Sequence, residues 1–353
     1  MKFFASNILA AFGISLFLSA HSVAAEPANA CVADSGISYV CGLMNAEDLL
    51  SVGDSEFIIT SGMTDEGVNG HVYLIDTRDN SWHDLVSAAN FSQDFDSASY
   101  SSCPGLFDVT NFSAHGLALR ETGADAFDLY ITSHGGREAI EIFDLSLAGG
   151  DAKLTWRGCV PLDESIMHNS VAILADGGFA TTQFMEWERG IAASVTGLVK
   201  GGVVIWRPGG EPAVLLGTEL AGPNGIVVSE DNRYLYVAAL GTRELVRFDL
   251  SQEPVASDSV ALDIILDNIR WGESGKLLTA GGNAGGNGWS VVEVDAASLD
   301  ATRIGAAASG NGGGGSDDDE NGCGSDSGCC RVEIADSVAA GAPVSISGGV
   351  ATG

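Results

Sequence analysis

The chain has 353 residues, which is enough for one large domain or for two smaller ones. Its 47 Asp and Glu residues outnumber its 16 Lys and Arg residues, so the formal net charge is −31 at pH 7. A field of this sign repels nucleic acids and anionic membranes, which argues against nucleic-acid binding, and it attracts divalent cations.

The N-terminal segment has the composition of a removable targeting signal. Lys2 precedes an apolar run from Ile8 to Leu18, and the small residues Val23-Ala24-Ala25 follow it. The run is too short to span a bilayer, so we predict a signal peptide at 1–25. No later segment is apolar and long enough for a transmembrane helix, and we expect residues 26–353 to be secreted or periplasmic.

Seven cysteines follow this segment, and in an oxidising compartment some of them should form disulfide bonds. Their positions are Cys31, Cys41, Cys103, Cys159, Cys323, Cys329 and Cys330. The sequence does not give their connectivity, and the odd number leaves at least one cysteine free or paired with another chain. Their spacing matches no zinc site.

The body of the chain repeats one order of parts, in which a polar residue leads an apolar strand, a turn and further strands. The repeats are residues 47–77, 114–146, 168–208, 223–251 and 267–295, with a damaged sixth at 331–353. A period of roughly 40–55 residues with three or four short strands is typical of a β-propeller. We therefore predict an all-β fold, in which residues 26–353 form one six-bladed β-propeller.

Two segments depart from the repeat. In the first, apolar residues are spaced for one face of a helix. These residues are Phe184, Trp187, Ile191, Val195 and Leu198. The second segment, about 308–330, is rich in glycine and aspartate and belongs to no blade, so we predict a flexible acidic insertion there.

Polar residues begin each predicted inner strand, although the strands themselves are apolar. The inner strands of a propeller line the central tunnel and run in the same direction, so their first residues meet at one mouth. Five of these residues offer carboxylate or amide oxygens: Glu47, Asn169, Asn224, Asp267 and Asn268. Such a set suits Ca²⁺, which takes about six to eight oxygen ligands. The sequence therefore predicts a metal site in the central tunnel.

Two histidines belong to the same region. His115 begins the inner strand of the second blade, and His134 follows the next strand across a hairpin. A histidine pair can take a proton from water, with the second ring orienting the first. The alternative is one buried polar histidine and one surface histidine, and the oxygen ligands could likewise hold an ion that only closes the tunnel, or no ion.

Six short motifs occur in the order found in a known family of propeller enzymes. They are NAEDLL (45–50), FSAHGLAL (112–119), LYITSHGG (129–136), HNSVAIL (168–174), GPNGIVVSEDNRYLYVA (222–238) and LDNIRWGESG (266–275). Over roughly residues 41–300 the chain resembles the serum paraoxonase/arylesterase family and, more distantly, the gluconolactonase and strictosidine-synthase-like propellers. The resemblance implies a six-bladed propeller that holds two calcium ions and hydrolyses lactones and aryl esters.

The resemblance also implies a role for particular residues. It places a catalytic calcium on Glu47, Asn169, Asn224, Asp267 and Asn268, and a water-activating dyad on His115 and His134. It places a structural calcium on Asp48, Ser170 and the backbone oxygen of Leu117. The family has an aspartate where this chain has Ser170, so we expect the structural site to be weakened or empty.

We therefore expect a calcium-dependent hydrolase of small-molecule lactones or esters. Ca²⁺ would polarise the substrate carbonyl, and the histidine dyad would activate water. The alternative that the sequence leaves open is a non-catalytic β-propeller that binds a ligand or a partner protein.

Overall fold

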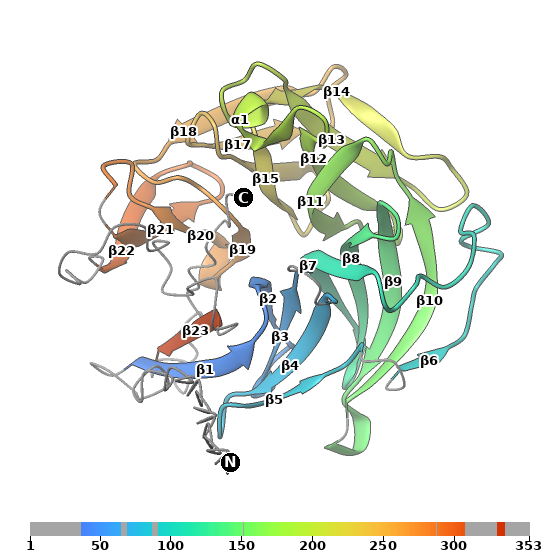
Figure 1. Cartoon of the computed structure of the whole chain (residues 1–353). Coiled ribbons are helices and arrows are strands. Elements are labelled where there is room, and N and C mark those ends of the chain that lie inside the picture. Colours follow the sequence, from blue (N-terminus) through green and yellow to red (C-terminus); the bar gives the residue numbers. More distant parts are fainter. Residues whose placement is uncertain are drawn as a thin grey trace, which may run out of the picture. The chain divides into compact units, whose positions relative to one another are not determined.

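The strands of this chain are short, and many, such as β3 (Phe57–Gly62), are buried along almost their whole length. The computed structural model describes residues 37–64, 69–86, 91–150, 152–286, 288–307 and 330–335, all within one unit of the chain, Cys31–Gly353. Five β-sheets of four or five strands lie around a common centre (Figure 1). The all-β propeller predicted from the repeats is confirmed. The predicted signal peptide and nearly all of the predicted insertion lie outside the described residues.

Each blade is an antiparallel meander whose strands follow one another outward from the centre. The first blade contains β2 (Ala46–Ser51), β3, β4 (His71–Asp76) and β5 (Ser81–Asp84). The second contains β7 (Phe112–Gly123), β8 (Ala126–Gly135), β9 (Ala139–Ser146) and β10 (Lys153–Pro161), with β6 (Phe91–Gln93) parallel to β10. The third contains β11 (Ile166–Ile173), β12 (Phe179–Glu186), β13 (Gly201–Trp206) and β14 (Ala213–Leu220). The fourth contains β15 (Pro223–Val228), β16 (Tyr234–Ala239), β17 (Glu244–Asp249) and β18 (Ala256–Ala261). The fifth contains β19 (Ile269–Trp271), β20 (Lys276–Gly282), β21 (Trp289–Asp295) and β22 (Ala301–Ala307).

The prediction of six blades is wrong for the part of the chain that is described, which forms five blades and a two-stranded sheet. The damaged sixth repeat supplies one described strand, β23 (Cys330–Ala335), and this strand pairs with β1 (Ile37–Leu43). Val40 and Leu43 of β1 pack against Leu49 of the first blade. Counting repeats could not find this sheet, because its two strands come from opposite ends of the described chain.

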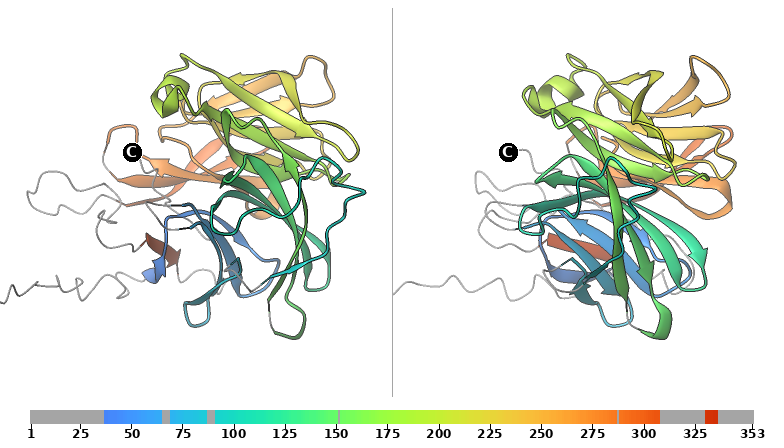
Figure 2. Two further views of the ribbon diagram at one scale, coloured as in Figure 1. Left: turned by 45° about the vertical axis from the view of Figure 1, so that its right-hand side comes forward. Right: turned by 90° about the vertical axis from the view of Figure 1, so that its right-hand side faces the viewer.

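The predicted helix over 184–198 is much shorter in the structure. Phe184 belongs to β12, and only α1 (Gly190–Val195) is helical. Glycines with positive φ angles, Gly190 at 70° and Gly197 at 70°, limit the helix to this short turn. Figure 2 shows α1 on the face of the blades that is toward the viewer in Figure 1. Among the described residues, no helix is long and apolar enough to cross a membrane.

Apolar side chains fill the space between neighbouring blades. Ile226 and Val237 of the fourth blade, for example, belong to one buried cluster with Ala172 and Val203 of the third. A disulfide between Cys103 and Cys159 joins the segment before β7 to β10, which confirms the prediction of disulfide bonding. Cys41 is also disulfide-bonded.

The inner strands of four blades contain a β-bulge at the same level. At each bulge three residue steps on the inner strand match two steps on its neighbour, so one extra residue is inserted. The residues within these bulges are Glu47-Asp48 in β2, His115-Gly116 in β7, Asn169-Ser170 in β11 and Asn224-Gly225 in β15. Because bulges turn side chains out of the regular alternation, they direct these polar groups toward the centre.

A glycine follows the polar residue in two of these bulges because the next blade lies very close. A Cβ atom on Gly225 would lie 2.7 Å from Asp267 O and 2.8 Å from Asn268 Cα. A Cβ atom on Gly116 would lie 2.3 Å from Asn169 O. In the Asn-Gly and His-Gly pairs, the first residue supplies a polar side chain. The glycine after it has no side chain, so the adjacent inner strand can approach closely.

We predict that Gly225→Ala destabilises the protein by roughly 2 kcal/mol or more, because its Cβ meets backbone atoms that cannot rotate away. Thermal unfolding monitored by circular dichroism measures this change. The matched control is Gly282→Ala in β20, where the added Cβ meets no atom within 4 Å. Equal melting temperatures for the two variants would contradict this account of the bulge glycines.

Candidate functional site

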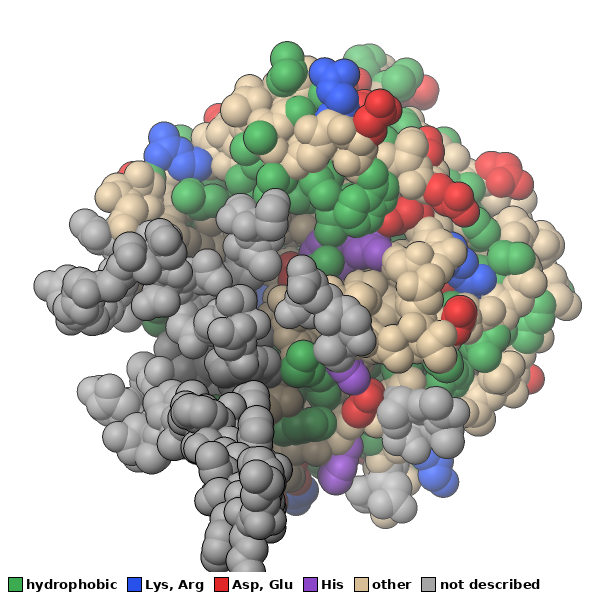
Figure 3. All heavy atoms as spheres, viewed as in Figure 1, with side chains coloured by type: hydrophobic (Ala, Val, Ile, Leu, Met, Phe, Trp, Pro, Cys, Tyr) green, Lys and Arg blue, Asp and Glu red, His purple; other side chains and the backbone are tan. Residues whose placement is uncertain are grey.

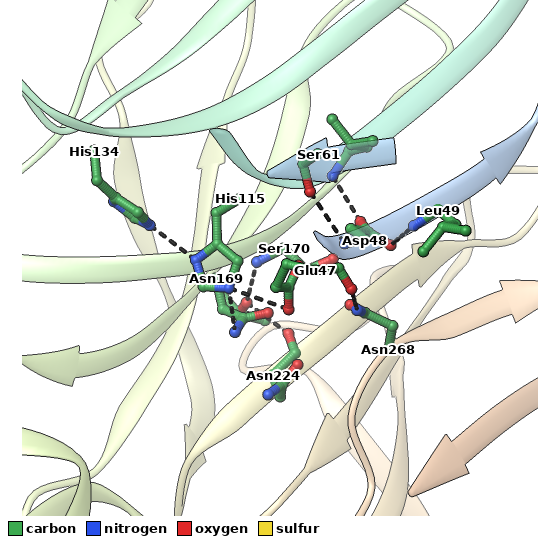
Figure 4. Close-up of polar contacts among 12 residues, drawn as sticks. Glu47, Asp48, Leu49, Ser61, His115, His134, Asn169, Ser170, Asn224 and Asn268 are labelled. Atoms are coloured by element: carbon green, nitrogen blue, oxygen red, sulfur yellow. Dashed lines mark hydrogen bonds and ion pairs between the residues drawn. The ribbon is translucent and has the colours of Figure 1, made fainter. Parts of the chain in front are cut away.

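The polar residues of the inner strands gather where the blades meet. Figure 4 shows the side chains of Glu47, Asn169, Asn224 and Asn268 directed toward one another from four different blades. Asn169 and Asn224 are 3% and 1% exposed, whereas the side chain of Glu47 is 15% exposed. Asp267 joins the group, because the side chain of Asn224 hydrogen-bonds its carboxyl group. The structure thus brings together all five residues that the sequence suggested as ligands of one ion.

Each of these five side chains has one buried oxygen without a hydrogen-bond partner among the described residues. The oxygens, here called the five-oxygen cluster, are Glu47 Oε2, Asn169 Oδ1, Asn224 Oδ1, Asp267 Oδ1 and Asn268 Oδ1. A buried polar group left without a partner destabilises a fold by roughly 1–3 kcal/mol. Carboxylate and amide oxygens are the ligands that Ca²⁺ prefers, so the cluster fits this cation.

The amides are essential to that fit. Among the described residues, no group of three or more His, Cys, Asp or Glu side chains could hold a metal ion. The five-oxygen cluster contains only two such side chains, Glu47 and Asp267. Any cation bound here would therefore depend on neutral oxygen donors as well, which suits calcium better than zinc.

The charged groups of the site shift one another's pKa values. Burial, together with the charge of Glu47, raises the pKa of Asp267 to about 7. Burial would also raise the pKa of Glu47, but the charges of His115 and Arg270 outweigh it and lower that pKa. Burial would lower the pKa of His115, but Glu47, Asp267 and Asp48 outweigh it and raise that pKa. Asp267 therefore holds a proton near neutral pH that a divalent cation would displace.

A chain of hydrogen bonds, here called the histidine relay, leads from Glu138 through two histidines to the cluster. Glu138 Oε1 lies 2.8 Å from His134 Nδ1, and His134 Nε2 lies 2.8 Å from His115 Nδ1. His115 Nε2 lies 3.2 Å from Glu47 Oε1 and 3.2 Å from Asn169 Nδ2. His115, His134 and Glu138 are at most 5% exposed.

The relay assigns the protons of both imidazoles. A carboxylate only accepts hydrogen bonds, so His134 Nδ1 donates to Glu138 and His134 Nε2 accepts from His115 Nδ1. Burial lowers the pKa of His134 and so favours its neutral ring, although Glu138 opposes the shift. His115 therefore presents its remaining nitrogen, Nε2, to the five-oxygen cluster.

Sequence reasoning missed Glu138. Trp187 Nε1 donates to Glu138 Oε1 at 3.1 Å, and the indole packs edge-on against His134 with 5.7 Å between ring centroids. The one signal in the sequence is a carboxylate four residues after His134. The same stretch contains Glu141, which pairs with Arg137 instead, so the sequence could not distinguish the two.

The residues suggested for a second ion lie beside the cluster. Unlike the oxygens of the cluster, both carboxylate oxygens of Asp48 accept hydrogen bonds. Leu49 N donates to Asp48 Oδ1 at 2.8 Å, and Leu117 N donates to Asp48 Oδ2 at 2.7 Å. The guanidinium of Arg270 also donates to Asp48 Oδ1. Burial raises the pKa of Asp48, and Arg270 opposes that shift. The hydroxyl of Ser170 is buried and has no partner among the described residues.

The surface next to the relay can receive a small molecule. Figure 3 shows histidine side chains next to hydrophobic ones near the centre of the face that is toward the viewer in Figure 1. His134 lines a pocket of ≈ 310 Å³ together with Leu106, Phe107, Phe112 and Arg137. Polar and charged side chains, Asp108, Arg137 and Glu164 among them, interrupt these apolar walls, so the pocket suits a ligand that has both an apolar and a polar part.

Solved structures resemble this chain only distantly. Luciferin-regenerating enzyme is 13% identical, with 75% of this chain and 76% of that chain covered and a TM-score of 0.46. Streptogramin B lyase is 13% identical, with 76% and 72% covered and a TM-score of 0.45. Regucalcin from Agrobacterium tumefaciens strain C58, described as a calcium-binding protein, is 12% identical, with 75% and 74% covered and a TM-score of 0.45. Identities of 12–13% with TM-scores of 0.45–0.46 do not place this chain in the family of any of these proteins.

No family model matches the sequence, and no curated protein matches it. The resemblance to the serum paraoxonase/arylesterase family therefore stays a prediction that rests on the six sequence motifs. The geometry described above stands independently of that resemblance.

We predict that metal-free protein becomes less stable as the pH rises from 6 to 8. The pKa of Asp267 is raised from 3.8 to about 7 in the folded chain, so between these values the folded state holds a proton that the unfolded state has lost. This stabilisation disappears as the pH passes the folded value, and His115 acts with the same sign. Melting temperatures in chelator at pH 6 and pH 8 measure the difference.

The comparison must be made between variants, because burial also raises the pKa of Glu141 to about 7. Asp267→Asn should reduce the fall in melting temperature between pH 6 and pH 8, whereas Asp263→Asn, at an exposed position, should leave it unchanged. An undiminished fall in Asp267→Asn would show that Asp267 does not hold the proton.

Proposed function

We propose that this chain is a secreted, calcium-dependent hydrolase of small lactones or aryl esters. The observation that carries the proposal is the convergence of five unpartnered, buried oxygens beside a histidine whose orientation is fixed by two further residues. The sequence resemblance to the serum paraoxonase/arylesterase family supports the same reaction class. The disulfide between Cys103 and Cys159 supports an oxidising compartment.

The five-oxygen cluster is the set of groups that would hold the ion. Its two carboxylates, Glu47 and Asp267, balance the charge of one divalent cation, and its three amides add neutral oxygens. A bound calcium ion supplies positive charge to the oxygen of a substrate carbonyl, because five protein oxygens leave part of its usual set of about six to eight to other ligands.

His115 is the residue placed to move the proton. Its Nε2 faces the cluster, so it takes a proton from water while the water oxygen forms a bond to the carbonyl carbon. The carbon–oxygen bond to the leaving group then breaks, and the leaving oxygen takes the proton from His115 Nε2. A lactone gives a hydroxy acid by these steps, and an aryl ester gives an acid and a phenol.

His134 and Glu138 act as positioning residues. They hold His115 Nδ1 in a hydrogen bond, which prevents the ring from turning its other nitrogen toward the cluster. The carboxylate of Glu138 also stabilises the positive charge that the relay gains when His115 accepts a proton. Trp187 contacts both Glu138 and His134, which are buried, and is itself 45% exposed. It therefore lies between these two residues and the solvent.

We predict that exhaustive chelation abolishes hydrolysis and lowers the melting temperature, and that Ca²⁺ restores both, because a ligand bound only to the folded state stabilises it. Asn224→Ala removes one oxygen of the cluster and should weaken calcium binding by roughly tenfold or more. Gln252→Ala removes an exposed amide and is the matched control. Calorimetric titration measures the affinity, and full activity of metal-free protein would refute the mechanism.

We predict that His115→Gln lowers kcat for lactones and aryl esters by about 10²-fold or more, because Gln cannot take up a proton. Glu138→Gln should lower kcat less and change the pH profile of kcat/KM, because it removes only the support of the relay. His83→Gln, at an exposed position outside the site, should change neither. Tight calcium binding by all variants, with no hydrolysis of either substrate class by the unmutated protein, would instead favour a non-catalytic binding propeller.

A further inference from the structure

We propose that the guanidinium of Arg270 takes the place of a second divalent cation, so that the folded chain binds one calcium ion and not two. The count of one ion rests on the proposed function, whereas the exclusion of a second ion beside Asp48 does not. Asp48 is 1% exposed and lies at a bulge of the first blade. It is the only carboxylate among the three residues that the sequence suggested for a second calcium.

Both carboxylate oxygens of Asp48 already have hydrogen-bond donors within the described residues. Both carboxylate oxygens accept hydrogen bonds from backbone nitrogens, those of Leu49 and Leu117, and Oδ1 also accepts from Arg270. Neither Asp48 oxygen is among the unpartnered buried atoms, in contrast to all five members of the five-oxygen cluster. Leu117 moreover directs its N–H toward Asp48, and an N–H group repels a cation.

The suggested ligands of a second ion carry little charge. Asp48 is their one carboxylate, it already faces the guanidinium of Arg270, and the hydroxyl of Ser170 adds no charge. A calcium ion that displaced Arg270 would gain one charged ligand from this set, and calcium affinity is lower when fewer ligands are charged. It would also leave a guanidinium of low exposure, 22% for the side chain, without its carboxylate partner.

Arg270 also has the connections that a structural cation would provide. It is the middle residue of β19 in the fifth blade, and its Nε donates to Leu49 O of the first blade at 3.0 Å. Its Nη1 donates to Ile269 O at 2.7 Å. Through Asp48 and Leu117 N it is linked to the second blade as well. The side chain therefore joins three blades at the point where the first and fifth inner strands meet.

The first experiment counts bound ions in the unmutated protein by calorimetric titration with Ca²⁺ after chelation. We expect one ion per chain, whose affinity falls in Asn224→Ala. Two ions of similar affinity would overturn the proposal, and so would one ion that persists in Asn224→Ala but is lost in Asp48→Asn. Binding of no ion would refute the proposed function, while the exclusion of calcium beside Asp48 would stand.

The second experiment removes the positive charge of Arg270. In chelator, Arg270→Gln should lower the melting temperature by roughly 5–10 °C, because it leaves a buried carboxylate without its charged partner. The double variant Arg270→Gln with Ser170→Asp should bind two calcium ions and regain stability when Ca²⁺ is added. An unchanged melting temperature of Arg270→Gln in chelator would overturn the proposal. If Arg270→Gln fails to fold, Arg270→Lys, which keeps the charge, provides the melting comparison, and the ion count of the unmutated protein still decides.

Discussion

A buried oxygen without a hydrogen-bond donor destabilises a folded chain, and five oxygens that have no partner among the described residues meet where the inner strands of this propeller converge. These five oxygens come from residues far apart in the sequence, so the cost of burying them falls at one place in the fold. The same crowding shifts the pKa values of the charged groups: burial and the charge of Glu47 raise the pKa of Asp267 to about 7, and the nearby carboxylates raise the pKa of His115. A divalent cation bound to the five oxygens would remove these conflicts together, and the proposed catalysis depends on that binding.

The β-bulges convert local sequence into this arrangement. Each inserts one extra residue at the same level of an inner strand. In two of them a hydroxyl group of the neighbouring strand accepts a hydrogen bond from a backbone N–H group of the bulge. Ser61 Oγ accepts from Asp48 N at 3.0 Å, and Thr182 Oγ1 accepts from Ser170 N at 3.1 Å. In these two bulges the backbone N–H group keeps a hydrogen bond, whereas one side-chain oxygen each of Glu47 and Asn169 has no partner among the described residues.

The sequence was informative where the signal is local and repeated. The pair Asn224-Gly225 could be placed on an inner strand because the strand and turn that follow it recur along the chain. Contacts between distant segments left no such signal. Arg270 lies 222 residues from Asp48 in the sequence. Glu138 contacts His134 across a turn whose sequence does not distinguish it from other turns of the chain. The number of blades was overestimated for a related reason, since the sheet of β1 and β23 pairs two ends of the described chain.

A crystal structure of the protein grown with Ca²⁺ tests the central claim most directly. Our account predicts one ion bonded to all five oxygens of the cluster at about 2.3–2.6 Å, with Arg270 still on Asp48. It also predicts that His115 Nε2 faces the open side of that ion. An ion bound to Asp48 in place of Arg270, or a cluster that stays free of metal at saturating Ca²⁺, would contradict the account.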